Sequence, residues 1–314
     1  MTAYVVRRLL AFIPTFLVVA IVVFFMIYLI PGDPVRLMLG LEVEAEAIAR
    51  KRAELGLDRP LQERLVIWLG HVAQGDLGDS YFLNQPVSQA IVERLPVTIS
   101  LSTLSLLIAV GLGVSAGVIA SIKQGSMSDW GVMLLSLLGL SMPTFWLALN
   151  LILLFAVMWQ WFPVGGYVPL TKDPLEYLRH LFLPSLCLGL VNAAVIARMT
   201  RSSMLEVLRS DYVRTARAKG LYERVVVYKH ALKNALIPVI TSIGIVAGVL
   251  LGGAVITETV FNLPGVGRLV VEAVKRRDYL VVQSTILVIT GSYLFVNLVV
   301  DLIYTWANPR IRYD

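Results

Sequence analysis

Six long apolar stretches alternate with polar segments along the chain. They cover approximately residues 9–30, 97–122, 130–158, 181–197, 235–256 and 280–303. A helix of about 20 apolar residues crosses roughly 30 Å of hydrocarbon. The pattern therefore predicts an all-α polytopic membrane protein with six transmembrane helices. The fourth stretch is the weakest, because its 17 residues, with Pro184 near one end, only just reach across.

The composition excludes several other classes of protein. Of 314 residues, 57 % are hydrophobic and only 15 % are charged, whereas soluble domains carry about 25 % charged residues. The mean hydropathy is +0.77. Cys187, the single cysteine, cannot form an intrachain disulfide and is expected to pack as a small hydrophobic residue. These values exclude a soluble globule, a disordered or fibrous chain and a disulfide-stabilised secreted domain.

The distribution of charge predicts the topology. Residues 31–95 hold 7 Lys/Arg and 10 Asp/Glu, whereas residues 198–235 hold 9 Lys/Arg and 3 Asp/Glu. Basic residues near short flanks favour the cytoplasm, which places both termini inside. Four basic residues oppose this assignment without reversing it: Arg268, Lys275, Arg276 and Arg277. The predicted organisation is an amino-terminal helix over 1–30, a periplasmic segment over 31–95 and a core of five transmembrane helices over 96–314.

The segment 31–95 is expected to contain short helices of its own. It opens with PGDP, which ends the first helix, and helix-like stretches follow at 42–55 and 61–72. In the second, apolar residues recur at helical spacing: Leu61, Leu65, Trp68, Leu69 and Val72. Two interpretations are open, a small interfacial subdomain or a stripe that only packs on the membrane domain.

The apolar stretches lack the residues of an ion-driven transporter or an enzyme. Glu258 and Asp301 lie near the ends of stretches, where either could reach water. The chain has no nucleotide-binding loop and no HExxH, CxxC or GxSxG motif. Polar side chains such as Asn150 and Asn192 are expected either to form interhelical hydrogen bonds or to line a path. Glycines at 244, 248 and 252, and at 113 and 117, predict close helix packing.

The basic loop at 202–235 carries the most information about function. Ser210 or Asp211 can cap a helix that Gly220 ends, and a second helix runs from about 221 to 234. Small residues at 215, 216, 218 and 220 lie among Arg214, Arg217 and Lys219. This pattern suits docking into a groove with an acidic rim. A loop that only fixes topology and touches lipid headgroups fits the composition equally well.

Sequence motifs along nearly the whole chain resemble one family. The loop reads RTARAKG at 214–220 and HALK at 230–233, which is similar to the EAA–Gly–Ile-x-Leu-Pro signature of permease subunits in bacterial ABC importers. Ala216, Gly220 and Leu232 match that signature, while Arg214, Thr215, His230 and Lys233 depart from it. Other segments resemble the dipeptide, oligopeptide, glutathione and nickel branch in the same order: RRLL, PGDP, LGLDRPL, GDLG, RLPVT, FNLPGVGRL and NPRIRY.

The resemblance implies a type I ABC importer permease in the bacterial inner membrane, which is not an enzyme. It implies a second, homologous permease, two cytoplasmic ATPase subunits that bind ATP and Mg, and a periplasmic or lipid-anchored substrate-binding protein, with no cofactor in this chain and no nucleic acid. Peptide, glutathione, nickel chelate and opine remain open as substrates, with short peptides favoured. The implied ATPase-coupling residues are Arg214, Thr215, Ala216, Arg217, Ala218, Lys219, Gly220 and Leu232. The alternative is a membrane-embedded receptor or enzyme that docks a cytosolic partner on the basic loop.

Overall fold

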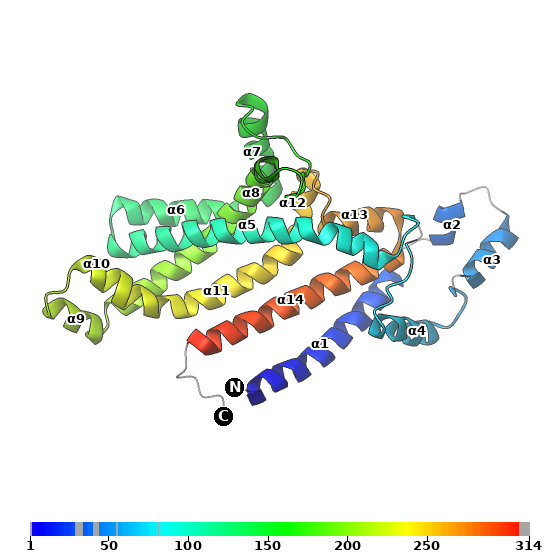
Figure 1. Ribbon diagram of the computed structural model, residues 1–314, viewed down its shortest axis with the longest axis horizontal. Coiled ribbons are helices and arrows are strands. Elements are labelled where there is room, and N and C mark those ends of the chain that lie inside the picture. The colour runs from blue at the N-terminus through cyan, green and yellow to red at the C-terminus, as the bar shows by residue number, and fades with distance from the viewer. Residues whose placement is uncertain (1, 29–33, 40–43, 55, 81, 308–314) are drawn as a thin grey trace. The chain divides into compact units, whose positions relative to one another are not determined.

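The chain folds into two compact units. A computed structural model describes residues 2–28, 34–39, 44–54, 56–80 and 82–307. The first unit comprises 1–97 and 264–292, and the second comprises 98–263 and 293–314. Within the described residues the regular structure is helical, apart from an isolated bridge between Asp79 and Pro86 (Figure 1). Residues 264–292 pack with the amino-terminal part of the chain, and the division into 1–30, 31–95 and 96–314 relative to the membrane stays a prediction.

The first unit consists of short helices around two long ones. Its elements are α1 (Thr2–Tyr28), α2 (Pro34–Leu39), α3 (Ala45–Glu54), α4 (Leu61–Ala73), the first turns of α5 (Val87–Ile122), α13 (Val266–Arg276) and the first half of α14 (Tyr279–Ala307). Helices α3 and α4 confirm the two helical stretches expected between 42 and 72, although residues 42, 43 and 55 lie outside the described residues.

The apolar stripe of α4 packs on the long helices of the first unit. Trp68 is buried against Phe24 of α1, with ring centroids 5.6 Å apart, and shares a cluster with Ala20 and with Leu287 of α14. Leu65, Leu69 and Val72 pack against the same cluster. The stripe therefore anchors the segment on membrane helices, which supports the simpler of the two interpretations of the sequence.

A buried hydrogen bond joins the 75–86 loop to the start of α14. The Ser80 hydroxyl donates to Asp278 Oδ2 at 2.5 Å and accepts from the backbone N–H of Leu83 at 2.9 Å. Arg277 precedes Asp278 with a left-handed φ of 56°, and so closes α13. The loop that follows GDLG and the start of α14 are thus joined across 198 residues of sequence.

The second unit is a bundle of long helices joined by short ones. Its elements are the rest of α5, α6 (Met127–Ser141), α7 (Thr144–Leu151), η1 (Ile152–Met158), α8 (Pro174–Leu208), α9 (Asp211–Ala218), α10 (Glu223–Val225), η2 (Val226–Ala231), α11 (Leu232–Gly253), α12 (Val255–Val260) and the end of α14. Helix α8 packs against both α6 and α11. Cys187 of α8 is buried and unbridged, as expected.

The third apolar stretch is bent, although the sequence predicted one span over 130–158. Helix α6 ends at Ser141. The segment that follows, α7 with η1 (Thr144–Met158), makes an angle of 105° with α6. The cause is Pro143, which lacks an N–H and forces the residue before it out of the helical region. Met142 accordingly has an extended ψ of 128°.

The fourth stretch, expected to be the weakest because of its length, lies in a helix that extends beyond it at both ends. Helix α8 has 35 residues, with Pro184 inside it. It begins early because the Asp173 side chain accepts the N–H groups of Leu175 and Glu176, and Pro174 suits the first helical position. Its apolar window is 61 % buried, the highest share among the long apolar helices of the described chain.

The number of membrane spans stays a prediction. Among the described residues, four helices are long and apolar enough to cross a membrane, and five if the bent pair counts as one span. A shorter apolar stretch, Leu10–Met26, lies within α1. The six-span topology requires α1 and the bent pair each to cross once.

Glycines set how closely the helices of the second unit approach. A Cβ on Gly113 of α5 would lie 2.7 Å from the Ile196 Cβ of α8, and one on Gly117 would lie 2.5 Å from the Thr200 Cβ. A Cβ on Gly248 of α11 would lie 2.6 Å from the Tyr293 ring of α14. These contacts confirm the close packing expected from the glycine spacing, since a larger residue has no room at these positions.

Alanine at Gly117 is expected to destabilise the fold, and alanine at Gly111 is not. The Gly117 Cβ would also meet the Ala197 carbonyl at 2.6 Å, so the backbones must separate at a cost of about 1–3 kcal/mol. Gly111 lies in the same helix with nothing within 4 Å, and there alanine gains about 0.5–1 kcal/mol of helix propensity. Thermal unfolding of the purified variants measures both; equal shifts would contradict the packing described.

Candidate functional site: the connection between α8 and α11

The basic loop forms a compact helical turn, here called the knob, over residues 209–231. The Ser210 carbonyl accepts the N–H groups of Val213 and Arg214, and α9 follows. Gly220 ends it with a left-handed φ of 75°. Helices α10, η2 and α11 then run without interruption into the apolar stretch, and Figure 1 shows α9 and α10 at one end of the second unit. The expected helix, glycine and helix are all confirmed.

The interior of the knob is a small apolar cluster. Val213 and Ala216 of α9 are buried against Val226 of η2, and Val207 and Leu208 of α8 pack around them. Ala216 is only 7 % exposed. The sequence suggested Ala216 as a contact for a partner, but its small side chain instead lets α9 lie against η2. Any effect of Ala216 on docking is therefore indirect.

The outer surface of the knob holds most of the other candidate residues. Arg214, Thr215, Ala218, Lys219 and Gly220 are exposed. The Arg214 side chain is 72 % exposed, and its guanidinium lies 3.6 Å from Asp211. A Cβ on Gly220 would meet nothing within 4 Å. The surface therefore combines positive charge with a glycine over which another protein can approach.

Arg217, which is exposed, and Leu232, which is partly buried, both make contacts that hold the knob together. Arg217 donates two hydrogen bonds to Glu223, at 2.6 and 3.1 Å, across the Gly220 turn. Leu232 is partly buried in a cluster that holds Val118 of α5, Met204 of α8 and Val227 of η2. These contacts fix the knob to three long helices, so a force on its surface is transmitted to α5, α8 and α11.

Two further contacts hold the same end of the unit and were not expected from the sequence. Arg201 of α8 donates to both carboxylate oxygens of Asp129 of α6, at 2.5 and 2.7 Å. Asp129 also accepts the N–H of Gly125 at 3.0 Å. Asn234 of α11 donates to the Tyr212 hydroxyl of α9 at 2.8 Å. A signal for the first contact was present, since both charged residues lie at ends of apolar stretches.

Polar side chains within the long helices match the expectation of interhelical hydrogen bonds only in part. Glu258 is fully buried and accepts a hydrogen bond from Thr98 at 2.6 Å, so the suggestion that it reaches water is wrong. Asn150 and Asn192 each donate to a carbonyl four residues earlier in their own helix, at 2.7 and 2.8 Å, and are not interhelical. Ser102 does bond across helices, to the Leu250 carbonyl. Among the described residues no cluster suited to a metal ion occurs.

Comparison with known proteins identifies the family. Residues 109–313 match the family model described as "Binding-protein-dependent transport system inner membrane component", and residues 1–102 match the model of its amino-terminal segment. The chain belongs to this family. It is the permease subunit of an ABC importer, a multi-pass protein of the bacterial inner membrane, and the family is one of transport proteins rather than of enzymes or receptors.

Relatives match the permease over its full length. It is 48 % identical to a putative peptide transport system permease protein of Brucella abortus and 47 % identical to the di/tripeptide transport system permease protein DppB of Pseudomonas aeruginosa, with 100 % of each chain covered. It is 44 % identical to the glutathione transport system permease protein GsiC of Salmonella choleraesuis, again over 100 % of both chains.

A solved structure supports the fold. The permease matches a chain of the inward-facing MetNI methionine ABC transporter with a TM-score of 0.57 at 18 % identity, over 69 % of this chain and 95 % of that one. The fold is therefore that of a type I ABC importer permease, as the resemblance implied. A permease of this kind works with ATPase and substrate-binding partners.

Proposed function

We propose that the permease imports short peptides, and that nucleotide-driven movement reaches it through the knob. The peptide assignment rests on relatives at 44–48 % identity over the whole chain, most of which are named as permeases of peptide transport systems. Glutathione, itself a short peptide, belongs to the same substrate class. A nickel chelate or an opine has no comparable support among these relatives.

The observation that carries the coupling role is the build of the knob. Its exposed surface is basic and open at Gly220, and its interior is continuous with three long helices. In this proposal Arg214 and Lys219 bind an acidic rim on the ATPase. Thr215, Ala218 and Gly220 allow close approach, while Ala216, Arg217 and Leu232 keep the knob rigid. Closure of the ATPases would then move α5, α8 and α11 together.

The proposed assembly contains a second, homologous permease, two ATPase subunits and a substrate-binding protein that is periplasmic or lipid-anchored. The chain itself binds no cofactor in this scheme, because ATP and Mg belong to the ATPases. Membrane lipid surrounds the long helices, and nucleic acid has no part. The substrate path lies between the two permeases.

Transport in reconstituted vesicles tests the proposed function. The permease, its partner permease and their ATPases are reconstituted with the substrate-binding protein and given a radiolabelled dipeptide. ATP-dependent accumulation is expected, and it should stop when non-hydrolysable ATP is supplied. Accumulation of a nickel chelate or an opine, with none of any dipeptide or of glutathione, would contradict the substrate assignment.

Thiol labelling tests the proposed topology. In a Cys187→Ser background, cysteine at Glu44 or Gln74, both exposed, should react with an impermeant thiol reagent applied to the outside of cells. Cysteine at exposed Lys219 should react only after the membrane is opened. The reason is the excess of basic residues in the 198–235 segment. Labelling of Lys219→Cys in intact cells would show that the predicted orientation in the membrane is reversed.

A further inference from the structure

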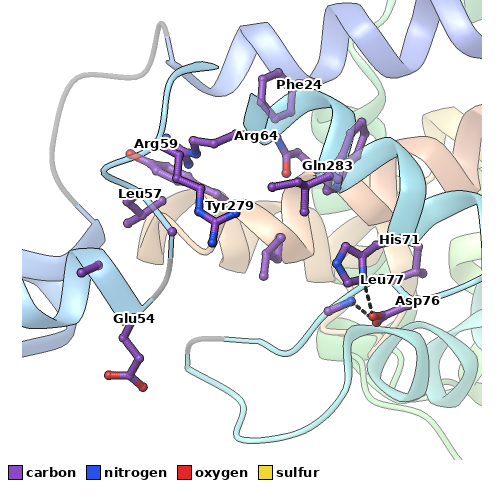
Figure 2. A pocket seen from close by; sticks show the side chains of 16 residues that line it. Phe24, Glu54, Leu57, Arg59, Arg64, His71, Asp76, Leu77, Tyr279 and Gln283 are labelled. Atoms are coloured by element: carbon purple, nitrogen blue, oxygen red, sulfur yellow. Dashed lines mark hydrogen bonds and ion pairs between the residues drawn. The ribbon is translucent and has the colours of Figure 1, made fainter. Parts of the chain in front are cut away.

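A cavity of about 370 Å³ lies in the first unit, beside α4. It is lined by the buried ends of α1 and α14, by α3 and α4, and by the two loops at 56–59 and 76–78 (Figure 2). Phe24, Leu57, Ile67, Leu77 and Leu280 supply apolar lining. Its volume lies within the range of about 300–1,000 Å³ that is usual for small-ligand sites.

Two buried polar groups in the lining have no partner. Gln283 is 4 % exposed, and its carboxamide makes no hydrogen bond within the described part of the chain. The Trp68 indole N–H is likewise buried and unbonded there. A buried polar group without a partner costs about 1–3 kcal/mol. Figure 2 shows the Gln283 side chain next to Phe24 within the lining, where a ligand could satisfy it.

The rim of the cavity carries charges of both signs, on different sides. Arg59 and Arg64 lie on one side, near Tyr279, and the His71–Asp76 pair lies on another, next to Leu77 (Figure 2). His71 Nδ1 is 2.8 Å from Asp76 Oδ2. The Gly78 N–H and His71 lower the pKa of Asp76, so its carboxylate is ionised at neutral pH. Glu54 is also a lining residue, but its carboxylate pairs with Lys51 at 2.7 Å and points away from the other lining side chains (Figure 2).

We propose that this cavity binds a short peptide in its zwitterionic form. The peptide carboxylate would face Arg64 and Arg59, of which Arg59 also pairs with Glu63 at 3.2 Å, and the ammonium group of the peptide would face Asp76. Its amide would pair with the Gln283 carboxamide, which offers both a donor and an acceptor, and a carbonyl would accept the Trp68 N–H. A simple anion fits less well, because Asp76 would repel it. The inference rests on the proposed function only in taking peptides as the transported class.

Direct binding to the full-length permease tests this site without any ATPase or binding protein. The purified chain in phosphatidylcholine nanodiscs is titrated with L-alanyl-L-alanine by isothermal titration calorimetry. Saturable binding at one peptide per chain is expected. N-acetylation of the peptide, or amidation of its carboxylate, removes one charge and is expected to weaken binding at least about tenfold, since each removes one charge-assisted contact.

Variants locate the binding in the cavity. Gln283→Leu keeps the approximate shape and removes the carboxamide, whereas Trp68→Phe removes the indole N–H together with one ring, and each is expected to weaken binding about tenfold. Gln62→Leu, on the same helix as Trp68 but exposed and outside the lining, should bind as the wild type does. Trp68→Phe also removes a ring that packs on Phe24, so it should unfold at a lower temperature than the wild type, and Gln283→Leu separates loss of a polar group from loss of packing.

Three results would overturn the inference. They are no heat of binding at millimolar peptide, equal affinity for the acetylated peptide, or unchanged binding in both Gln283→Leu and Trp68→Phe. A fourth result would come from native mass spectrometry of the wild type and of Gln283→Leu. A phospholipid that is bound to the wild type and lost from the variant would assign the cavity to a lipid headgroup. If vesicle uptake of dipeptide is intact while the chain alone does not bind it, this site is wrong and the proposed function stands.

Discussion

Valine in place of Gly220 is expected to reduce ATP-driven uptake at least about tenfold while the permease still inserts in the membrane. Gly220 has a φ of 75°, which a β-branched residue adopts only with strain on the order of 1–2 kcal/mol. The side chain would also project from the open surface of the knob. The long helices are held by their own backbone bonds and should be unaffected. Uptake and co-purification of the ATPases measure the effect.

Two further variants separate the effect of a side chain on the knob surface from the effect of backbone strain. Gly75, on the predicted outer segment, has a φ of 79° and an equally open Cβ. Gly75→Val therefore carries the same strain and should keep its ATPases. Gly220→Asn puts a side chain on the knob at lower conformational cost, and should fall between wild type and Gly220→Val. Full ATPase attachment in Gly220→Val would show that the knob only anchors topology.

Arg201→Met is expected to destabilise the permease more than Asp129→Asn does. The Asp129 side chain is 6 % exposed and the Arg201 side chain is 25 % exposed. Loss of Arg201 leaves a buried carboxylate with only the Gly125 N–H as partner, and breaking such a pair costs about 3–5 kcal/mol. Loss of the Asp129 charge leaves an arginine that can reach water. This change is expected to lower the free energy of unfolding by only about 1–3 kcal/mol.

A double-mutant cycle checks that the two residues act as a pair. Asp129→Leu with Arg201→Met replaces both charges with apolar side chains, and this combination should be more stable than Arg201→Met alone. Thermal unfolding in detergent, followed by tryptophan fluorescence, is measured for the wild type, Asp129→Leu, Arg201→Met and the double variant. Additive effects of the two single changes would mean that the observed contact contributes little.

Two prolines show how far the sequence predicts the long helices. Pro143 breaks the third stretch by 105°, whereas Pro184 lies inside the 35-residue α8. The hydrophobic pattern predicted both stretches because burial in lipid depends on composition alone. It could not predict which proline bends the chain. That outcome depends on packing, since Pro184 is buried inside the second unit and α8 contacts both α6 and α11.

The knob was partly predictable for a similar reason. Gly220 was found because a glycine between two helical stretches points to a left-handed turn, which is a local signal. The burial of Ala216 depends on Val226, ten positions away and on another helix. The Arg201–Asp129 contact spans 72 residues of sequence. Such contacts depend on how the helices pack against one another. A single sequence without relatives does not specify that packing.

The makeup of the first unit limits how these permeases can be recombined. Residues 264–292 pack with 1–97, yet they fall within the carboxyl-terminal family segment, 109–313, while the amino-terminal segment covers 1–102. A chimera joined between the two family segments would separate Ser80 from its native Asp278, and Trp68 from its native Leu287. An exchange of the outer segment between related importers would preserve these contacts only if 264–292 moved with it. The amino-terminal family segment is thus a unit of sequence but not a unit of folding.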